Sequence, residues 1–312
     1  MLLTNIVLLS FVALSGAARQ RIKPNELALR NAEHTINIQF PRTLMGKDWR
    51  NQASYSDLLA AESTREYLAF SKAQDEEDIM LYENWFYGMK DGLLLESGAC
   101  QGDSLSLGYL FERFAKWSAI NVEPDPSVFR LLKSNRREAI NIFTALCSNE
   151  NQVFHYTDAM GMGSPVRGFI EFMDPKFLEK FHPDIFNNKT SLEDLAKMRC
   201  VTVKNLLRSL AVSRLDVWIL DVEGAEEEVL LGTDFSAVHI DVVVMENDGF
   251  NKDKDRRKVA ILENNDFSCT QIDRNVFCKH KTFHPSTKPH IATSQSSSKQ
   301  IAYWDGLKWI MR

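Results

Sequence analysis

The chain has 312 residues, of which 44% are hydrophobic and 25% are charged, a globular composition with length for one ordinary domain plus extensions. Its 37 basic and 42 acidic residues give a net charge of −5, so the overall charge predicts no nucleic-acid partner. The five cysteines include no Cys-x-x-Cys pair, which argues against a zinc site and against a dense disulfide framework.

The first 18 residues have the pattern of a secretory signal peptide. Residues 6–14 form an apolar core, and Ser15-Gly16-Ala17 supplies the small residues of a cleavage site. The stretch is shorter than the roughly 20 residues that a spanning helix needs. We therefore predict a signal peptide over 1–18, a secretory or extracellular location and no membrane span after cleavage, with an uncleaved anchor as the alternative. Residues 19–90 are predicted to be a helical extension.

The core is predicted to begin with a strand over residues 92–96. A turn containing Gly98, Ala99 and Gly102 follows, and a helix is predicted over 104–116. A strand, a tight turn and a helix in this order open a nucleotide-binding α/β unit, because glycine lets the backbone approach a ligand closely.

The ligand that this turn favours is a cation. A dinucleotide fingerprint would need glycine at positions 97, 99 and 102, and only Gly102 satisfies it. The strand ends in Glu96, whose carboxylate would repel a pyrophosphate. S-adenosylmethionine (SAM) carries an ammonium and a sulfonium and no phosphate. The spacing Glu96-x-Gly98-x-x-x-Gly102 is similar to the first motif of SAM-dependent methyltransferases.

Two more strands follow in alternation with helices. A predicted strand over 119–123 ends at Glu123, about 20 residues past the glycine turn, where nucleoside-binding folds place a carboxylate on ribose hydroxyls. Pro126 suits the first turn of the next helix, and 140–146 is predicted to be the third strand. The alternation predicts an α/β fold with a doubly wound, mostly parallel sheet over 91–282.

Residues 147–215 form a long excursion before the next core strand. Asp158 follows a short predicted strand and is a candidate partner of an adenine amine, with a solvated loop acid as the equal alternative. Asn188-Lys189-Thr190 is an N-glycosylation sequon, which matters only in a secreted chain. A short strand and a helix are predicted over 201–210.

The second strong motif is a pair of strands that both end in carboxylates. A buried strand over 217–220 leads to Asp221, with Glu223 in the following turn, and a strand over 240–245 leads to Glu246. Doubly wound sheets bind ligands at the carboxyl ends of their strands. Asp221 and Glu246 are therefore candidates to hold a divalent cation, which the sequence does not require, or to orient and deprotonate a hydroxyl.

The C-terminal part is predicted to be a helix over 254–265 and a hairpin over 268–279. A two-residue turn would place Cys269 opposite Cys278, so we hypothesise a disulfide between them in an oxidising compartment. Residues 283–312 are predicted to be a polar linker and a second hairpin around Asp305-Gly306.

Together these motifs resemble the FkbM-type methyltransferases, a SAM-dependent O-methyltransferase family. The matching runs are Glu96-Ser97-Gly98-Ala99, Gly102-Asp103, Glu123-Pro124-Asp125-Pro126, Leu215-Asp216, Asp221-Val222-Glu223-Gly224-Ala225-Glu226 and the strand that ends at Glu246. The chain departs from the family's pattern at Glu96, Cys100, Asp125 and Lys204-Asn205. The resemblance implies a class I methyltransferase sheet with an antiparallel last strand.

We therefore predict that the chain is a SAM-dependent O-methyltransferase that acts on a hydroxyl of an unidentified acceptor. The cofactor set is predicted to be Glu96, Gly98, Ala99, Gly102, Asp103, Glu123 and Asp158. Asp221 is the first candidate to position the hydroxyl or accept its proton, and Glu223 is the second. A SAM-fold binding protein without transfer activity is the alternative. An NAD(P)-dependent oxidoreductase is third, because the dinucleotide fingerprint fails.

Overall fold

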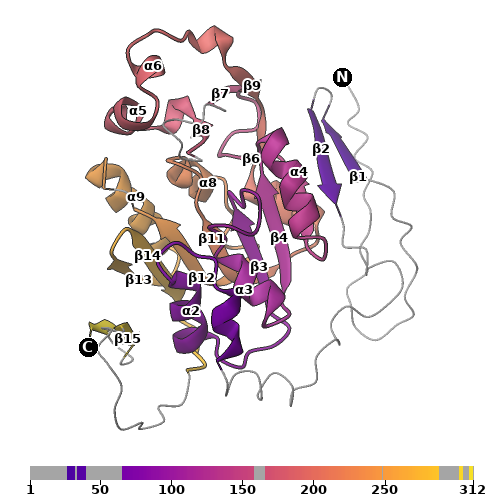
Figure 1. Cartoon of the computed structure of the whole chain (residues 1–312), viewed down its shortest axis with the longest axis vertical. Coiled ribbons are helices and arrows are strands. Elements are labelled where there is room, and N and C mark those ends of the chain that lie inside the picture. The colour runs from indigo at the N-terminus through magenta and orange to yellow at the C-terminus, as the bar shows by residue number, and fades with distance from the viewer. Residues whose placement is uncertain are drawn as a thin grey trace.

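A nine-stranded sheet forms the centre of the computed structural model (Figure 1). The structure describes residues 27–31, 34–39, 65–157, 166–247, 249–287, 302–304 and 309–311. From one edge to the other the sheet contains β1 (Leu27–Asn31), β2 (His34–Gln39), β5 (Ile140–Phe143), β4 (Ser118–Glu123), β3 (Leu93–Ser97), β11 (Arg214–Leu220), β12 (His239–Glu246), β14 (Asn275–His280) and β13 (Phe267–Ile272). The five strands from β5 to β12 are parallel, and β14 runs antiparallel to β12, as predicted.

The central strands are apolar because both of their faces are buried. In β11, Val217 and Ile219 belong to the core on one face, and Trp218 and Leu220 belong to the core on the other. Alternate residues of a strand point to opposite faces, so a continuous apolar run is what a strand covered on both sides requires. This pattern explains why the central strand could be identified from the sequence.

Helices cover both faces of the sheet. The first core includes residues of α7 (Val203–Ser209), α8 (Glu226–Leu231) and α9 (Lys252–Glu263). The second includes residues of α2 (Glu77–Trp85) and α3 (Gly108–Arg113). The remaining core helix, α4 (Pro126–Asn135), has Pro126 in its first turn and is capped by the Asp125 side chain. The doubly wound α/β prediction is confirmed.

The prediction of a helical extension over 19–90 was wrong for residues 27–31 and 34–39. A short 3₁₀ helix, Glu66–Phe70, and α2 are present, but β1 and β2 form a hairpin that adds to the edge of the sheet beside β5. The sequence Thr35-Ile36-Asn37-Ile38-Gln39 alternates in polarity, which is the period of a strand, and a free sheet edge offers the pairing partner.

Two core boundaries also differ from the prediction. The first helix begins at Gly108 and not at residue 104, since Leu105 has a φ of 64° and helical geometry is impossible there. The predicted strand over 140–146 divides into β5 and a separate β6 (Ala145–Leu146), which pairs with β10 (Cys200–Val201) outside the main sheet.

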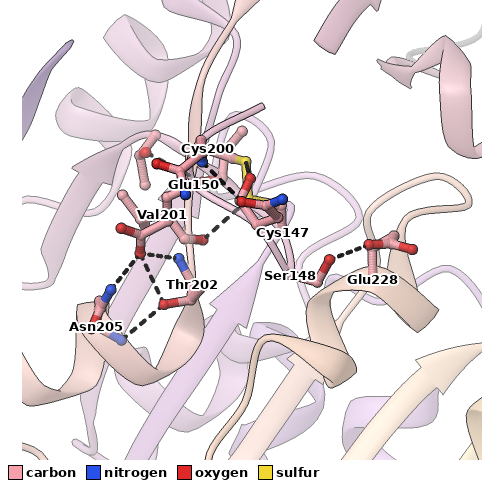
Figure 2. The surroundings of a disulfide bond; sticks show 12 residues. Cys147, Ser148, Glu150, Cys200, Val201, Thr202, Asn205 and Glu228 are labelled. Atoms are coloured by element: carbon pink, nitrogen blue, oxygen red, sulfur yellow. Dashed lines mark hydrogen bonds between the residues drawn. A yellow bond between two sulfur atoms is a disulfide. The ribbon is translucent and has the colours of Figure 1, made fainter. Parts of the chain in front are cut away.

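The excursion before β11 is an insertion with a small sheet of its own, at the top of Figure 1. It contains β7 (Phe154–Thr157), β8 (Gly168–Phe169), a 3₁₀ turn (Ile170–Phe172), α5 (Pro175–Phe181), α6 (Pro183–Phe186), a second 3₁₀ turn (Leu192–Asp194) and β9 (Ala196–Met198). A disulfide between Cys147 and Cys200 closes its base (Figure 2). Beside it, Glu150 accepts hydrogen bonds from the Thr202 amide at 2.7 Å and from Asn205 at 2.8 Å. The two ends of the insertion are thus joined covalently and by hydrogen bonds.

The predicted helix and hairpins of the C-terminal part agree with the structure, whereas most of the predicted polar linker lies outside the described residues. Cys269 and Cys278 lie opposite each other on β13 and β14 and form the hypothesised disulfide. The last two strands, β15 (Ala302–Trp304) and β16 (Trp309–Met311), form an antiparallel pair. No helix within the described ranges is both long and apolar enough to cross a membrane. The predicted signal peptide over 1–18 lies outside the described residues.

Candidate cofactor and catalytic site

The first glycine of the turn after β3 is required by contact between two strand ends. Gly98 has a φ of +84°, and a Cβ atom there would lie 1.7 Å from the carbonyl oxygen of Asp221. The Asp221 amide in turn donates to the Ser97 carbonyl at 3.0 Å. The glycine turn and the predicted catalytic carboxylate are therefore held side by side at the carboxyl ends of β3 and β11.

The second glycine makes room for α4. A Cβ on Gly102, whose φ is +81°, would lie 2.5 Å from a methyl of Leu132 and 2.6 Å from Cγ of Arg136. Ala99 is buried against Leu132 in the same cluster. The close approach that glycine permits here is thus to the protein itself. The predicted contacts of Gly98, Ala99 and Gly102 with a ligand stay predictions.

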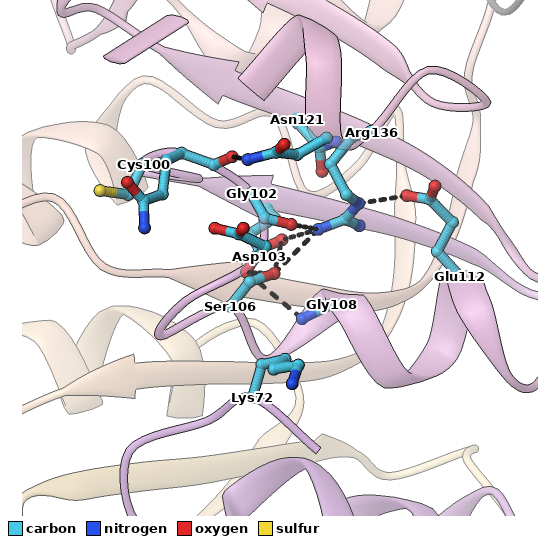
Figure 3. A network of polar contacts seen from close by, with 12 residues as sticks. Lys72, Cys100, Gly102, Asp103, Ser106, Gly108, Glu112, Asn121 and Arg136 are labelled. Carbon is cyan, nitrogen blue, oxygen red and sulfur yellow. Dashed lines mark hydrogen bonds and ion pairs between the residues drawn. The ribbon is translucent and has the colours of Figure 1, made fainter. Parts of the chain in front are cut away.

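Glu96 anchors the turn from inside the protein. Its carboxylate accepts hydrogen bonds from the Ser106 hydroxyl at 2.8 Å and from the Gly108 amide at 3.3 Å, and it pairs with Arg136 at 3.2 Å. Arg136 also pairs with Glu112 and donates to the Gly102 carbonyl at 3.2 Å (Figure 3). Burial alone would lower the pKa of Arg136, but the two carboxylates outweigh it and raise this pKa.

This network gives Glu96 a role in fixing the loop, which its sequence position did not reveal. Its predicted contact with the methionine part of SAM stays a prediction. Asp103 lies in the same loop, where its carboxylate accepts a hydrogen bond from the Ser104 amide at 2.6 Å. Its predicted part in the cofactor site is likewise untested.

Glu123 has a geometry that fits a ribose. It is buried at the end of β4, and its two oxygens accept the amides of Cys100 at 2.9 Å and Asp125 at 2.8 Å. A carboxylate has about four acceptor positions, so two remain for the hydroxyls of a sugar. Burial, followed by the charge of Asp125, raises the pKa of Glu123 to about 7, against the opposing effect of the two amide hydrogen bonds.

Two residues of the insertion reach this part of the site and were missed by the sequence reading. Arg167 pairs with Asp125 at 2.8 Å, and both side chains are largely buried. Tyr156 is buried, and its pKa is raised first by burial and then by the charges of Glu123 and Asp125, so its phenol stays neutral. No motif marks either residue, because only the folded insertion brings them next to β4.

Cys100, in the glycine turn, is a free thiol of low reactivity. It is not joined to another cysteine. Burial, and next the charge of Glu123, raise the pKa of Cys100 to about 11, so the thiol stays protonated near neutral pH. The thiolate is the reactive form of cysteine, so a protonated Cys100 is a poor nucleophile.

Asp221 is the accessible carboxylate of the site. It follows β11, is exposed to water, and its side chain has no hydrogen-bond partner within the described part of the chain. Surrounding protein nevertheless desolvates it, and this effect, followed by the Glu226 charge and opposed by Arg274, raises the pKa of Asp221 to about 7. A carboxylate with this pKa can exchange a proton near neutral pH.

The acids that follow Asp221 have other surroundings. Glu226 accepts hydrogen bonds from the amides of Val222 at 3.2 Å and Gly224 at 3.1 Å, so it holds the turn. Glu223 has a φ of 54° and packs beside Gly168 of the insertion. Glu223 is thus placed between the turn and β8, and its role as second candidate base is untested.

The structure gives no support to a metal at the strand ends. The Glu246 carboxylate lies 3.9 Å from the Arg274 guanidinium, whose positive charge would compete with a metal ion for this carboxylate. In the described ranges no group of three or more His, Cys, Asp or Glu side chains is placed to hold a metal ion. The Asp221–Glu246 metal pair stays a hypothesis. Asp158 lies outside the described residues, so its predicted contact with adenine is also untested.

Comparison with known proteins identifies the family of the chain. A model of the methyltransferase FkbM domain matches residues 96–277, which is more than half of the chain. None of the curated proteins compared matches.

Several solved structures are similar to the chain. Methyltransferase FkbM from Methylobacillus flagellatus KT is 13% identical, with 73% of this chain and 56% of that chain covered and a TM-score of 0.37. An O-methyltransferase from Bacillus cereus in complex with SAH is 11% identical, with 76% and 93% covered and a TM-score of 0.36. A TehB-like SAM-dependent methyltransferase from Corynebacterium glutamicum is 12% identical, with 72% and 97% covered and a TM-score of 0.34.

The matched segment begins at Glu96, at the end of the first parallel strand, and ends at Phe277 in the antiparallel β14. It therefore includes the glycine turn, Glu123 at the end of β4 and the turn after β11, which the structure brings together at one edge of the sheet. The chain belongs to the FkbM methyltransferase family, whose members are SAM-dependent.

Proposed function

We propose that this chain transfers the methyl group of SAM to a hydroxyl oxygen of its acceptor, with Asp221 as the group that receives the hydroxyl proton. The observation that carries the proposal is the state of Asp221. Its carboxylate is exposed to water, has no hydrogen-bond partner among the described residues and has a pKa raised to about 7. An acid that only stabilised the turn would be hydrogen-bonded to it, as Glu226 is.

The chain's own residues supply alignment and proton transfer. SAM, when bound, supplies a methyl group that its sulfonium already activates. Glu123 holds the ribose, and the Ser97–Asp221 backbone contact fixes the base relative to the glycine turn. Asp221 accepts the proton while the acceptor oxygen bonds to the methyl carbon and the carbon–sulfur bond breaks. Alignment of this kind is a large part of the rate enhancement in a two-substrate displacement.

Binding of SAM is the first test, because it needs no knowledge of the acceptor. Calorimetry on protein lacking residues 1–18 should show SAM binding that Glu123→Ala weakens about 10-fold to 100-fold, since a hydrogen bond to a charged group contributes roughly 1.5–3 kcal/mol. Asp221→Asn should leave the affinity nearly unchanged. Well-folded wild-type protein that binds no SAM would contradict the whole proposal.

Turnover is the second test, and it identifies the atom that is methylated. Radiolabelled SAM and fractionated cell extract should give a labelled product that survives mild base and releases methyl iodide in hot hydriodic acid, as methyl ethers do. A base-labile label would indicate a methyl ester and contradict a hydroxyl acceptor. SAM binding without a labelled product from any fraction would instead favour the non-catalytic alternative.

We also propose that the chain works in the secretory pathway or outside the cell. Two disulfides, Cys147–Cys200 and Cys269–Cys278, support this proposal, because disulfides persist in oxidising compartments and are rare in the cytosol. The signal-peptide pattern of residues 1–18 is independent support. The acceptor would then be a hydroxyl-bearing molecule of that compartment.

A further inference from the structure

Asn188 is the asparagine of the one Asn-x-Ser/Thr sequence in the 312-residue chain. It lies in the turn directly after α6, in the part of the insertion drawn at the upper left of Figure 1. Its φ of 56° is in the left-handed region, which asparagine tolerates better than most residues. The sequence Asn188-Lys189-Thr190 therefore falls in a tight turn and not inside a helix or strand.

The turn has its own backbone hydrogen bonds, which leave the asparagine side chain free. The amides of Lys189 and Thr190 both donate to the Asp184 carbonyl, at 2.8 Å and 3.1 Å. Asn188 and Lys189 are exposed to solvent. Within the described part of the chain, the Asn188 side chain makes no hydrogen bond. A group attached at its Nδ2 atom would displace no contact that holds the fold.

Room in the folded state matters because a glycan is added while the chain enters the lumen and must be accommodated once folding is complete. A buried or hydrogen-bonded asparagine fails this condition. The neighbouring Asn187 illustrates the difference. Its side-chain amide donates to the Pro183 carbonyl at 2.7 Å, and it begins no sequon. Asn188 meets both the sequence requirement and the structural one.

We infer that Asn188 is a site of N-linked glycosylation. The inference goes beyond the methyl-transfer proposal and rests on the proposed secretory location. The Nδ2 atom of Asn188 forms a bond to C1 of an oligosaccharide and loses one proton. The bond that breaks joins this C1 to the pyrophosphate of a lipid-linked donor, which leaves as the lipid pyrophosphate. The glycan would sit on the insertion, directly after α6.

The test is expression of the full chain in cultured mammalian cells, followed by treatment with peptide-N-glycosidase F. Wild-type protein should gain mobility on a gel, and its Asn188 peptide should be recovered with aspartate at that position. Asn188→Gln and Thr190→Ala should show no change with the glycosidase. The matched control Asn187→Gln and the variant Thr190→Ser, which keeps the hydroxyl of the sequon, should remain sensitive.

Two results would overturn the inference: wild-type chain without glycosidase-sensitive mass, or a mobility change that persists in Asn188→Gln. Alkylation of the same samples distinguishes the reasons for a negative result. Intact Cys147–Cys200 and Cys269–Cys278 disulfides without a glycan would reject the site alone. Free thiols at these positions would reject the secretory location with it. Neither result affects the methyltransferase proposal, which is tested by SAM binding of purified protein.

Discussion

Loss of the Cys147–Cys200 disulfide should cost more stability than loss of Cys269–Cys278. The first bridge closes a chain segment with a sequence separation of 53 residues, and the second closes one of 9. In the chain-entropy treatment, a crosslink restricts the unfolded chain more when the loop is longer. At room temperature the expected stabilisation is about 4 kcal/mol for the longer loop and roughly 2.5 kcal/mol for the shorter one. The expected difference is about 1.5 kcal/mol.

The assay is urea unfolding of three proteins followed by tryptophan fluorescence, which the buried Trp85, Trp117 and Trp218 make sensitive to loss of the core. The proteins are the wild type, the Cys147→Ala/Cys200→Ala double variant and the Cys269→Ala/Cys278→Ala double variant. Both variants should also show a steeper dependence on urea, because an uncrosslinked chain exposes more surface when it unfolds.

The control is the same comparison in the presence of a thiol reductant. The stability gap between wild type and each variant should then shrink to the difference between cysteine and alanine side chains. A stability gap that persists in reductant would show that packing of the buried sulfur atoms, and not the crosslink, stabilises the wild type. Equal losses for the two variants under oxidising conditions would refute the loop-length argument.

Four further predictions concern the network and the site. Arg136→Met should lower the free energy of unfolding by about 3–5 kcal/mol, because it leaves buried carboxylates without their cation. The control Arg130→Met, at an exposed position of the preceding helix α4, should change it by less than about 0.5 kcal/mol. Because burial raises the pKa of Glu123 to about 7, SAM affinity measured by calorimetry should increase as the pH rises from below to above this value, and Glu123→Gln should abolish that dependence. Once an acceptor is known, the pKa of about 7 at Asp221 predicts a kcat/KM for the acceptor, at saturating SAM, that falls about tenfold per pH unit below 7 and levels off above it. Asp221→Asn should lower kcat by about 10²-fold to 10⁴-fold, and an unchanged kcat would exclude it as the base.

The sequence by itself determined the architecture of the core and the location of its ligand edge. Buried parallel strands need continuous apolar runs, and the run before Asp221 marked β11 for that reason. Glycine at positions 98 and 102 marked the turn, because the backbone there has positive φ. The hairpin spacing of Cys269 and Cys278 was also enough to predict their disulfide, since the turn fixes the register of a two-stranded ribbon.

Only the tertiary structure decided which side chains meet across long sequence separations. Arg136 lies 40 residues from Glu96, and no local pattern indicates that they form a buried pair. The same holds for Arg167 beside Asp125, and for the Cys147–Cys200 bridge at the base of the insertion. The edge hairpin of β1 and β2 depended on the free edge of β5. Periodicity and motifs record local geometry, whereas burial, pKa shifts and ion pairs depend on packing between distant segments.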